Sequence, residues 1–187
     1  SEQELLSYWL ILEANIKTDI ETQYEKAWKK WNLNEIEEKT GDIAQELADF
    51  FSFAGRYKDF TERLYRLGLK LREKVLGPEH PDTAASLNNL GRLLVDKGDY
   101  DGAEPLYRRS LEIQEKVLGP EHPDTATSLN NLGLLLSDKG DYDGAEPLYR
   151  RSLEIQEKVL GPEHPNTAIS LNNLGRLLSD KGDYDGA

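Results

Sequence analysis

The sequence contains no cysteine in 187 residues. Without a thiol the chain can form no disulfide framework, no thiolate metal site and no cysteine nucleophile. This composition fits a reducing compartment, and we expect a cytoplasmic protein. Methionine is also absent, even at position 1, which predicts that the chain is processed or cut from something longer.

Positive charge and long apolar runs are also scarce. Lys and Arg number 23 against 35 Asp and Glu, for a net charge of -12. Binding to a phosphate backbone requires clustered basic residues, so we expect no nucleic-acid partner. The longest apolar run, Tyr8 to Leu12, is far shorter than the roughly 20 residues that span a bilayer. We therefore expect no membrane association.

The main feature of the sequence is a repeat of 42 residues. Residues 82–123 recur as residues 124–165 with three changes, and residues 166–187 begin a third copy. A fixed period of this length indicates a stacked array of helix-turn-helix units, because neither helix of a unit can bury its apolar face alone. The sequence therefore predicts an all-α solenoid.

Proline and glycine mark the helix ends within a unit. We expect the first helix over residues 82–97, with Pro81 at its start and Asp82 at the positive end of the helix dipole. Gly98 and Asp99 form the turn. The second helix is predicted over residues 100–118, because Gly119-Pro120 is a stop signal.

The N-terminal part departs from the repeat. We predict that residues 1–41 form a helical capping segment, which holds Trp9, Trp28 and Trp31. These aromatic residues either fill a core at the end of the array or contact a neighbouring domain. Residues 42–81 are interpreted as a degenerate first repeat, and residues 82–187 as the regular repeats, the last one truncated.

Small and large residues recur in each unit at a spacing that resembles the tetratricopeptide repeat: Leu87, Leu90-Gly91, Leu94, Gly98, Tyr100, Ala103, Tyr107 and Ser110. Together with SLNNLG, AEPLYRR, LEIQEKVLG and HPDTA, the 42-residue unit resembles the kinesin-light-chain type of repeat and its many bacterial relatives. The resemblance implies a right-handed α-α superhelical solenoid. Many relatives have alanine where this chain has Gly91, Gly133 and Gly175.

The differences between the copies gather on one side of the first helix. Five of the six fall on three repeat positions, occupied by Ala85, Thr127 and Ile169, by Arg92, Leu134 and Arg176, and by Val95 and Ser137. At about 100° per residue these positions lie at about 0°, 340° and 280° around the helix. They form one stripe, opposite Leu87, Leu90 and Leu94, which never change.

The second helix shows no such variation. Glu112, Gln114, Glu115 and Lys116, which we expect to be equally exposed, are identical in both copies. General tolerance of surface change does not explain this contrast. The stripe therefore predicts a surface that tunes specificity for a partner, or alternatively chance drift in young duplications.

Two consecutive asparagines lie beside the stripe in every copy, and recur as Asn88-Asn89, Asn130-Asn131 and Asn172-Asn173. An amide side chain offers both a donor and an acceptor, and asparagine is a poor helix former. We expect at least one of each pair to hold the backbone of an extended peptide. The alternative is that one of each pair bonds to the adjacent repeat.

Arg92 and Arg176 add donors on the same side. They would favour an acidic or C-terminal carboxylate group on the partner, or they pair with nearby aspartates such as Asp96, Asp138 and Asp180. The predicted partner-binding residues are therefore Ala85, Asn88, Asn89, Arg92, Val95, Asp96, Thr127, Asn130, Asn131, Leu134, Ser137, Asp138, Ile169, Asn172, Asn173 and Arg176.

Residues suited to catalysis or metal binding form no convincing set. His80, His122 and His164 occupy one loop position in successive repeats, too far apart to share a metal when packed helices are spaced at about 8–10 Å. We interpret them as loop-packing residues. The sequence contains no motif of a serine hydrolase, zinc protease or calcium loop. We expect no enzyme, no metal and no cofactor.

The resemblance implies a non-catalytic scaffold that binds a peptide or partner domain in a concave groove lined by the first helix of each repeat. The alternative is a sensor or oligomerisation arm of a larger signalling protein, such as a nucleotide-switch ATPase or a caspase-like protease. A third possibility is self-association through the last helix, where we expect Leu171, Leu174 and Leu178 to be uncovered.

Overall fold

The computed structural model describes residues 44–46, 48–49 and 58–182. The chain divides into two compact units, Ser1–Glu37 and Glu38–Ala187, and all of the described residues belong to the second. The predicted N-terminal capping segment and its three tryptophans lie outside the described residues. The domain boundaries drawn from the sequence stay predictions.

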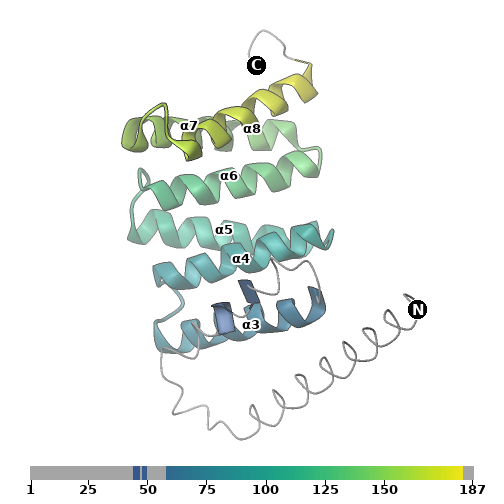
Figure 1. The fold of residues 1–187 in the computed structure, drawn as a ribbon, viewed down its shortest axis with the longest axis vertical. Helices are drawn as coiled ribbons and strands as arrows, with labels where there is room; N and C mark the ends of the chain where they lie inside the picture. The colour runs from purple at the N-terminus through teal and green to yellow at the C-terminus, as the bar shows by residue number, and fades with distance from the viewer. Residues whose placement is uncertain (1–43, 47, 50–57, 183–187) are drawn as a thin grey trace, which may run out of the picture. The chain divides into compact units, whose positions relative to one another are not determined.

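The described part of the second unit is built of helices joined by short turns, with no strand among its residues. Figure 1 shows the helices stacked in chain order, which confirms the predicted all-α solenoid of helix-turn-helix units. The helices are α3 Lys58–Val75, α4 Pro81–Asp96, α5 Tyr100–Val117, α6 Pro123–Asp138, α7 Tyr142–Leu160 and α8 Pro165–Lys181. The predicted ends of α4 and α5 are correct to within one residue.

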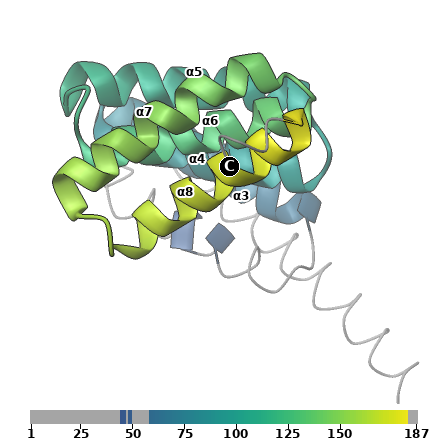
Figure 2. The same cartoon turned by 90° about the horizontal axis from the view of Figure 1, so that it is seen from above.

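Each second helix lies between two first helices. Helix α5 contacts both α4 and α6, and α7 contacts both α6 and α8. The first helices also contact one another, α4 with α6 and α6 with α8. Seen along the stack, the first and second helices form two layers (Figure 2).

The apolar residues that never change between copies form the core. Leu87 and Leu129 are fully buried, and they pack with Ile113 and Ile155 of the following second helices. Burying a leucine contributes roughly 1.5–3 kcal/mol, and the same cluster occurs in both complete repeats. The constant side of the first helix is therefore the side that faces the core.

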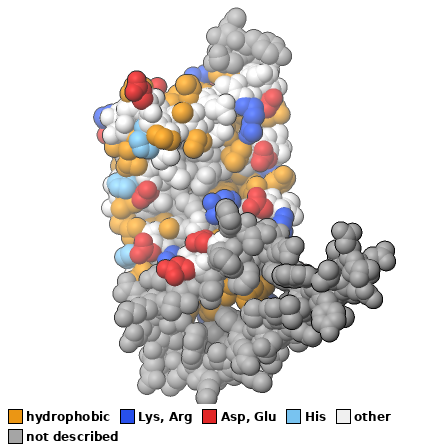
Figure 3. All heavy atoms as spheres, in the orientation of Figure 1, with side chains coloured by type: hydrophobic (Ala, Val, Ile, Leu, Met, Phe, Trp, Pro, Cys, Tyr) orange, Lys and Arg blue, Asp and Glu red, His pale blue; other side chains and the backbone are white. Residues whose placement is uncertain are grey.

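Each first helix begins with a histidine cap that the sequence analysis missed. The Nδ1 atoms of His80, His122 and His164 accept the backbone N–H two residues further on, at 3.2 Å in each case. The histidine side chains lie one above another along one edge of the array (Figure 3). Histidine is not among the usual capping residues, which is why the sequence suggested only loop packing.

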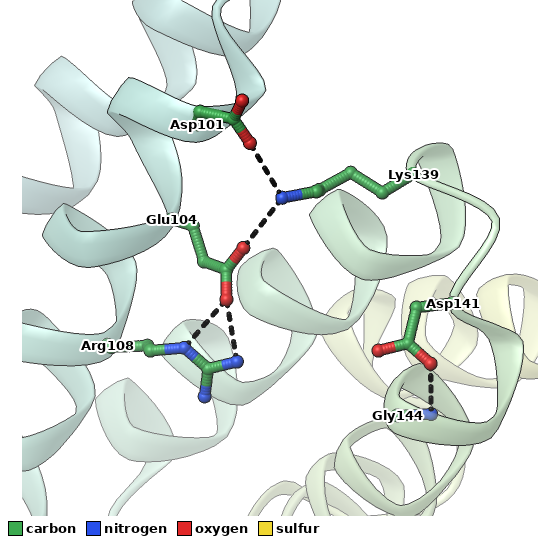
Figure 4. A network of polar contacts seen from close by, with 6 residues as sticks. All are labelled: Asp101, Glu104, Arg108, Lys139, Asp141 and Gly144. Carbon is green, nitrogen blue, oxygen red and sulfur yellow. Dashed lines mark hydrogen bonds and ion pairs between the residues drawn. The ribbon is translucent and has the colours of Figure 1, made fainter.

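Ion pairs between repeats follow the ends of the helices. Lys139 Nζ, just after α6, donates to Asp101 Oδ1 and Glu104 Oε2 of α5, both at 2.9 Å. Arg108 donates to the same Glu104 (Figure 4). Equivalent contacts join Lys97 to α3 and Lys181 to α7. This ladder ties each repeat to the one before it.

The expectation that four second-helix residues are equally exposed is wrong. Gln114 is buried at 4% exposure, and Glu115 is half-buried in an ion pair with Arg151 of the next repeat. Lys116 is exposed but pairs with Glu79 of the preceding repeat. Burial or contacts between repeats therefore account for the constancy of three of the four residues, whereas Glu112 is exposed and constant without such a contact.

The prediction of three uncovered leucines in the last helix is also partly wrong. Leu171 is 56% exposed, but Leu174 and Leu178 are buried. Helix α8 packs on α7, and this contact covers the two leucines on that side. Leu171 takes the place of the fully buried Leu87 and Leu129, so among the three it alone stays open.

Glycine on the first helix permits a tyrosine of the second helix to approach. A Cβ atom added at Gly91 would lie 2.8 Å from Tyr107 Cε1, and one added at Gly133 would lie 3.1 Å from Tyr149 Cδ1. At Gly175 no atom lies within 4 Å of that position. Close packing of a tyrosine against the first helix is thus present at two of the three glycines.

We predict that alanine has opposite effects at these positions. Gly91→Ala should lower the free energy of unfolding by about 1–3 kcal/mol, because overpacking forces Tyr107 to move, and Gly133→Ala should cost less. Gly175→Ala should stabilise α8 by up to about 1 kcal/mol through helix propensity. Urea unfolding followed by circular dichroism measures all three. Equal stabilisation by the three substitutions would show that tyrosine packing does not explain the glycines.

We also predict that Glu104 makes stability depend on pH. Hydrogen bonds from Lys139 and Arg108 hold the pKa of Glu104 below its usual 4.5. A carboxyl group with a lower pKa in the folded state stabilises the fold above the unfolded-state pKa, and this contribution is lost as the pH falls through the folded-state pKa.

Glu104→Gln should therefore reduce stability at pH 7, and its difference from the wild type should shrink below about pH 4.5. Urea unfolding at a series of pH values measures this. Glu112→Gln is the matched control, since Glu112 is exposed on the same helix and forms no ion pair among the described residues. A constant difference between Glu104→Gln and the wild type across this range would contradict the prediction.

Candidate functional site

The variable stripe lies mainly on the exposed side of the first helices. Ala85, Arg92, Thr127, Ile169 and Arg176 are exposed, and Leu134 is half-buried. The third stripe position is less open, since Val95 is half-buried and Ser137 is buried. Two of the three repeat positions thus face solvent as a surface that a partner could reach.

A hollow of about 390 Å³ lies between α4 and α6. Its walls include six of the residues predicted to bind a partner: Ala85, Asn88, Asn89, Arg92, Thr127 and Asn131. The remaining predicted residues do not line it: Val95, Asp96, Asn130, Leu134, Ser137, Asp138, Ile169, Asn172, Asn173 and Arg176. The structure therefore brings together the stripe and the asparagines at the first interface between regular repeats.

The two asparagines of a pair have different surroundings. Asn88 Nδ2 donates to Ser128 Oγ of the next repeat at 2.7 Å. Asn130 Oδ1 accepts from Asn173 Nδ2 of the next repeat at 3.1 Å. Asn88 and Asn130, the first asparagines of their pairs, therefore make the inter-repeat bond that the alternative interpretation describes, and Asn173, a second asparagine, is the partner of Asn130. Asn89 and Asn131 line the hollow without such a bond.

A buried polar seam runs behind the asparagines, and sequence analysis missed it. Ser110 Oγ donates to the Ala84 carbonyl at 2.8 Å, and Ser152 Oγ does the same to Ala126 at 2.7 Å. Ser170 Oγ donates to Gln156 Oε1 at 2.8 Å. The signal available in the sequence was the spacing of Ser110 and Gln114, which puts both on one helix face with Tyr107.

The predicted pairing of Arg92 with Asp96 does not occur, because no ion pair joins them within the described residues. Arg92 instead lies close to Tyr107. Burial raises the pKa of Tyr107, and the carboxylates of Asp96 and Asp138 act in the same direction, whereas Arg92 opposes them. The guanidinium group remains exposed on the stripe.

A second arginine, Arg176 of α8, lies in the same way beside Tyr149 of α7. Burial raises the pKa of Tyr149 to about 12, against the opposing influence of Arg176. Arg92 therefore lies beside Tyr107, which packs against its own helix α4. Arg176 of α8 lies beside Tyr149, which packs against the preceding first helix, α6. Both arginine side chains are exposed.

Across the described residues, no group of three His, Asp or Glu side chains is placed to hold a metal ion. None of the described helices is long and apolar enough to cross a membrane.

Known proteins share the repeat over most of the chain. A family model for the tetratricopeptide repeat matches residues 42–116, 94–156 and 129–187. Nephrocystin-3 of Xenopus laevis is 42% identical over 105 residues, which are 54% of this chain and 8% of that protein. The Xenopus tropicalis protein is 45% identical over the same share. The chain thus spans only a small part of these curated relatives.

Solved structures agree on the fold. BtubC (BKLC) from P. vanneervenii gives a TM-score of 0.75 at 26% identity, over 91% of this chain and 68% of that one. A putative kinesin light chain of Podosopora anserina, with nearly identical repeats, gives 0.71 at 27% identity over 79% and 69%. The apo form of RapI gives 0.71 at 20% identity over 88% and 57%, and shows the fold alone.

The family match covers well over half of the chain, and the similar structures include proteins with kinesin-light-chain repeats. This chain therefore belongs to the tetratricopeptide repeat family, with repeats of the kinesin-light-chain type.

Proposed function

We propose that the face formed by α4, α6 and α8 binds a peptide or a partner domain, and that the chain acts on its partner without catalysis. A protein-interaction scaffold is the general role that these repeats support. The finer proposal is that binding takes place in the groove along the first helices.

The observation that carries this proposal is the hollow between α4 and α6. Its volume of about 390 Å³ suits one or two side chains of a ligand. It is lined both by residues that vary between copies, such as Arg92, and by residues that do not, such as Asn89 and Asn131. Constant amides suit contacts to a peptide backbone, and varying positions suit recognition of its side chains.

An acidic or carboxylate group is one feature that the partner would carry. Arg92 and Arg176 are exposed and form no ion pair within the described residues. A guanidinium group offers two parallel donors to a carboxylate. Leu134 stands between them in the middle repeat, so the groove alternates charged and apolar positions.

Two other roles stay open as predictions. The matching repeats make up 8% of each curated relative. This favours the role of an arm in a larger protein, but it does not indicate which enzyme, if any, the larger protein contains. The exposed Ile169 and Leu171 of α8 would be the surface used in self-association.

The proposal predicts that peptides selected from a random library bind through the groove. The affinity of an enriched peptide should fall about tenfold in an Arg92→Glu, Asn131→Ala variant, which corresponds to about 1.4 kcal/mol. Isothermal titration calorimetry measures the change. Asn131 is chosen rather than Asn130, because Asn130 bonds to Asn173 and its loss would disturb the stack.

A matched control places substitutions on the second helices. Glu112→Ala, Glu154→Ala should leave the affinity unchanged, since both residues are exposed on α5 and α7. Circular dichroism must show equal helicity for all variants. Peptides that bind both variants as tightly as the wild type, or a library that yields no binder, would overturn groove binding.

A further inference from the structure

One end of the hollow is acidic and not neutralised by basic residues. Asp82 and Asp124, in the first turns of α4 and α6, both line it. Neither forms an ion pair with Lys or Arg among the described residues. The imidazoles of His80 and His122 lie beside them, each with Nδ1 3.7 Å from the carboxylate oxygen. Arg72 Nη1 also lies 3.4 Å from the backbone carbonyl oxygen of Asp82. In contrast, Glu104 at the helix edge is paired with two cations.

A buried acceptor lines the same hollow without a donor. Gln114 is only 4% exposed and reaches the hollow from α5. Its Oε1 accepts no hydrogen bond, whereas the equivalent Gln156 Oε1 accepts from Ser170 Oγ at 2.8 Å. Buried polar atoms are nearly always paired, so an unpartnered acceptor at the wall of a hollow suits a donor supplied by a ligand.

A second buried acceptor at the hollow, Asn88 Oδ1, also lacks a donor. Asn88 also lines the hollow, and its Nδ2 is occupied by Ser128 Oγ. Its Oδ1 is buried and has no partner. Two carboxylates and two amide oxygens thus surround this end, while Arg92 lies ten residues further along α4, about 15 Å from Asp82 at 1.5 Å per residue.

We propose that the hollow between α4 and α6 receives a basic side chain of the partner peptide, with its cationic head between Asp82 and Asp124. Arginine suits the site best, because a guanidinium group has five N–H donors and no acceptor, enough for both carboxylates and for an amide oxygen of the lining. This inference rests on the proposed function, and it names the type of side chain that the hollow between α4 and α6 would select.

The next repeat interface lacks these features. Asn166 replaces the second carboxylate, Ile169 replaces Thr127, and Leu134 replaces Arg92. Gln156 is already paired with Ser170. Of the two interfaces between α4, α6 and α8, the first is therefore the one that favours a basic side chain, and this would fix the position of a peptide along otherwise similar repeats.

The chain itself supplies the conservative substitution for a test. Asp82→Asn, Asp124→Asn copies the residue that begins the third repeat, Asn166, whose backbone N–H is capped by His164 in the same way. Glu112→Gln, Glu154→Gln is the control, since it changes the net charge equally at two exposed residues of α5 and α7 that do not line the hollow. A random-peptide library is selected against the full 187-residue chain and against both variants.

Peptides enriched by the wild type should share an arginine or lysine at one position. Replacing that residue with glutamine should weaken binding to the wild type about fivefold, the size expected for two partly exposed charge pairs. The same replacement should have little effect on binding to Asp82→Asn, Asp124→Asn. The Glu112→Gln, Glu154→Gln control should behave as the wild type.

Enriched peptides that bind through the groove but share no basic position would overturn this inference and leave the proposed function intact. An equal loss of basic preference in both variants would also overturn it, because the preference would then follow net charge alone. If no peptide binds through the groove, the proposed function fails and this inference fails with it.

Discussion

The structure depends on the burial of each second helix between two first helices. Leu87 and Leu129 are fully buried because Ile113 and Ile155 cover them, and neither surface would be stable in water alone. The approach is close because Gly91 leaves room for the ring of Tyr107. Once this contact is made, the direction of each first helix is fixed relative to the next.

This arrangement divides the residues of a repeat into two groups. Second-helix residues such as Glu104 and Glu115 pair with the adjacent repeat, and any change in one must suit its partner. The outer side of the first helix touches no other repeat at Ala85 or Arg92, which are exposed. Variation is therefore permitted there, and a binding surface can change without loss of the stack.

The buried polar seam gives the first interface its particular chemistry. Ser128 accepts from Asn88, while Gln114 is left without a donor. At the next interface Ser170 donates to Gln156 instead. Two interfaces with nearly the same sequence thus offer different groups to a ligand, and the first one combines acceptors with the carboxylates of Asp82 and Asp124.

The sequence by itself determined the all-α solenoid, its 42-residue unit and the helix ends, because period, proline and glycine act locally. It also identified the stripe and the asparagines, since helical spacing places them on one side. Only the tertiary structure decided that Gln114 is buried, that His122 caps α6 and that Leu178 is covered. Spacing places Gln114 on the same helix face as Tyr107, but which groups are buried or capped depends on what the neighbouring helices bring together.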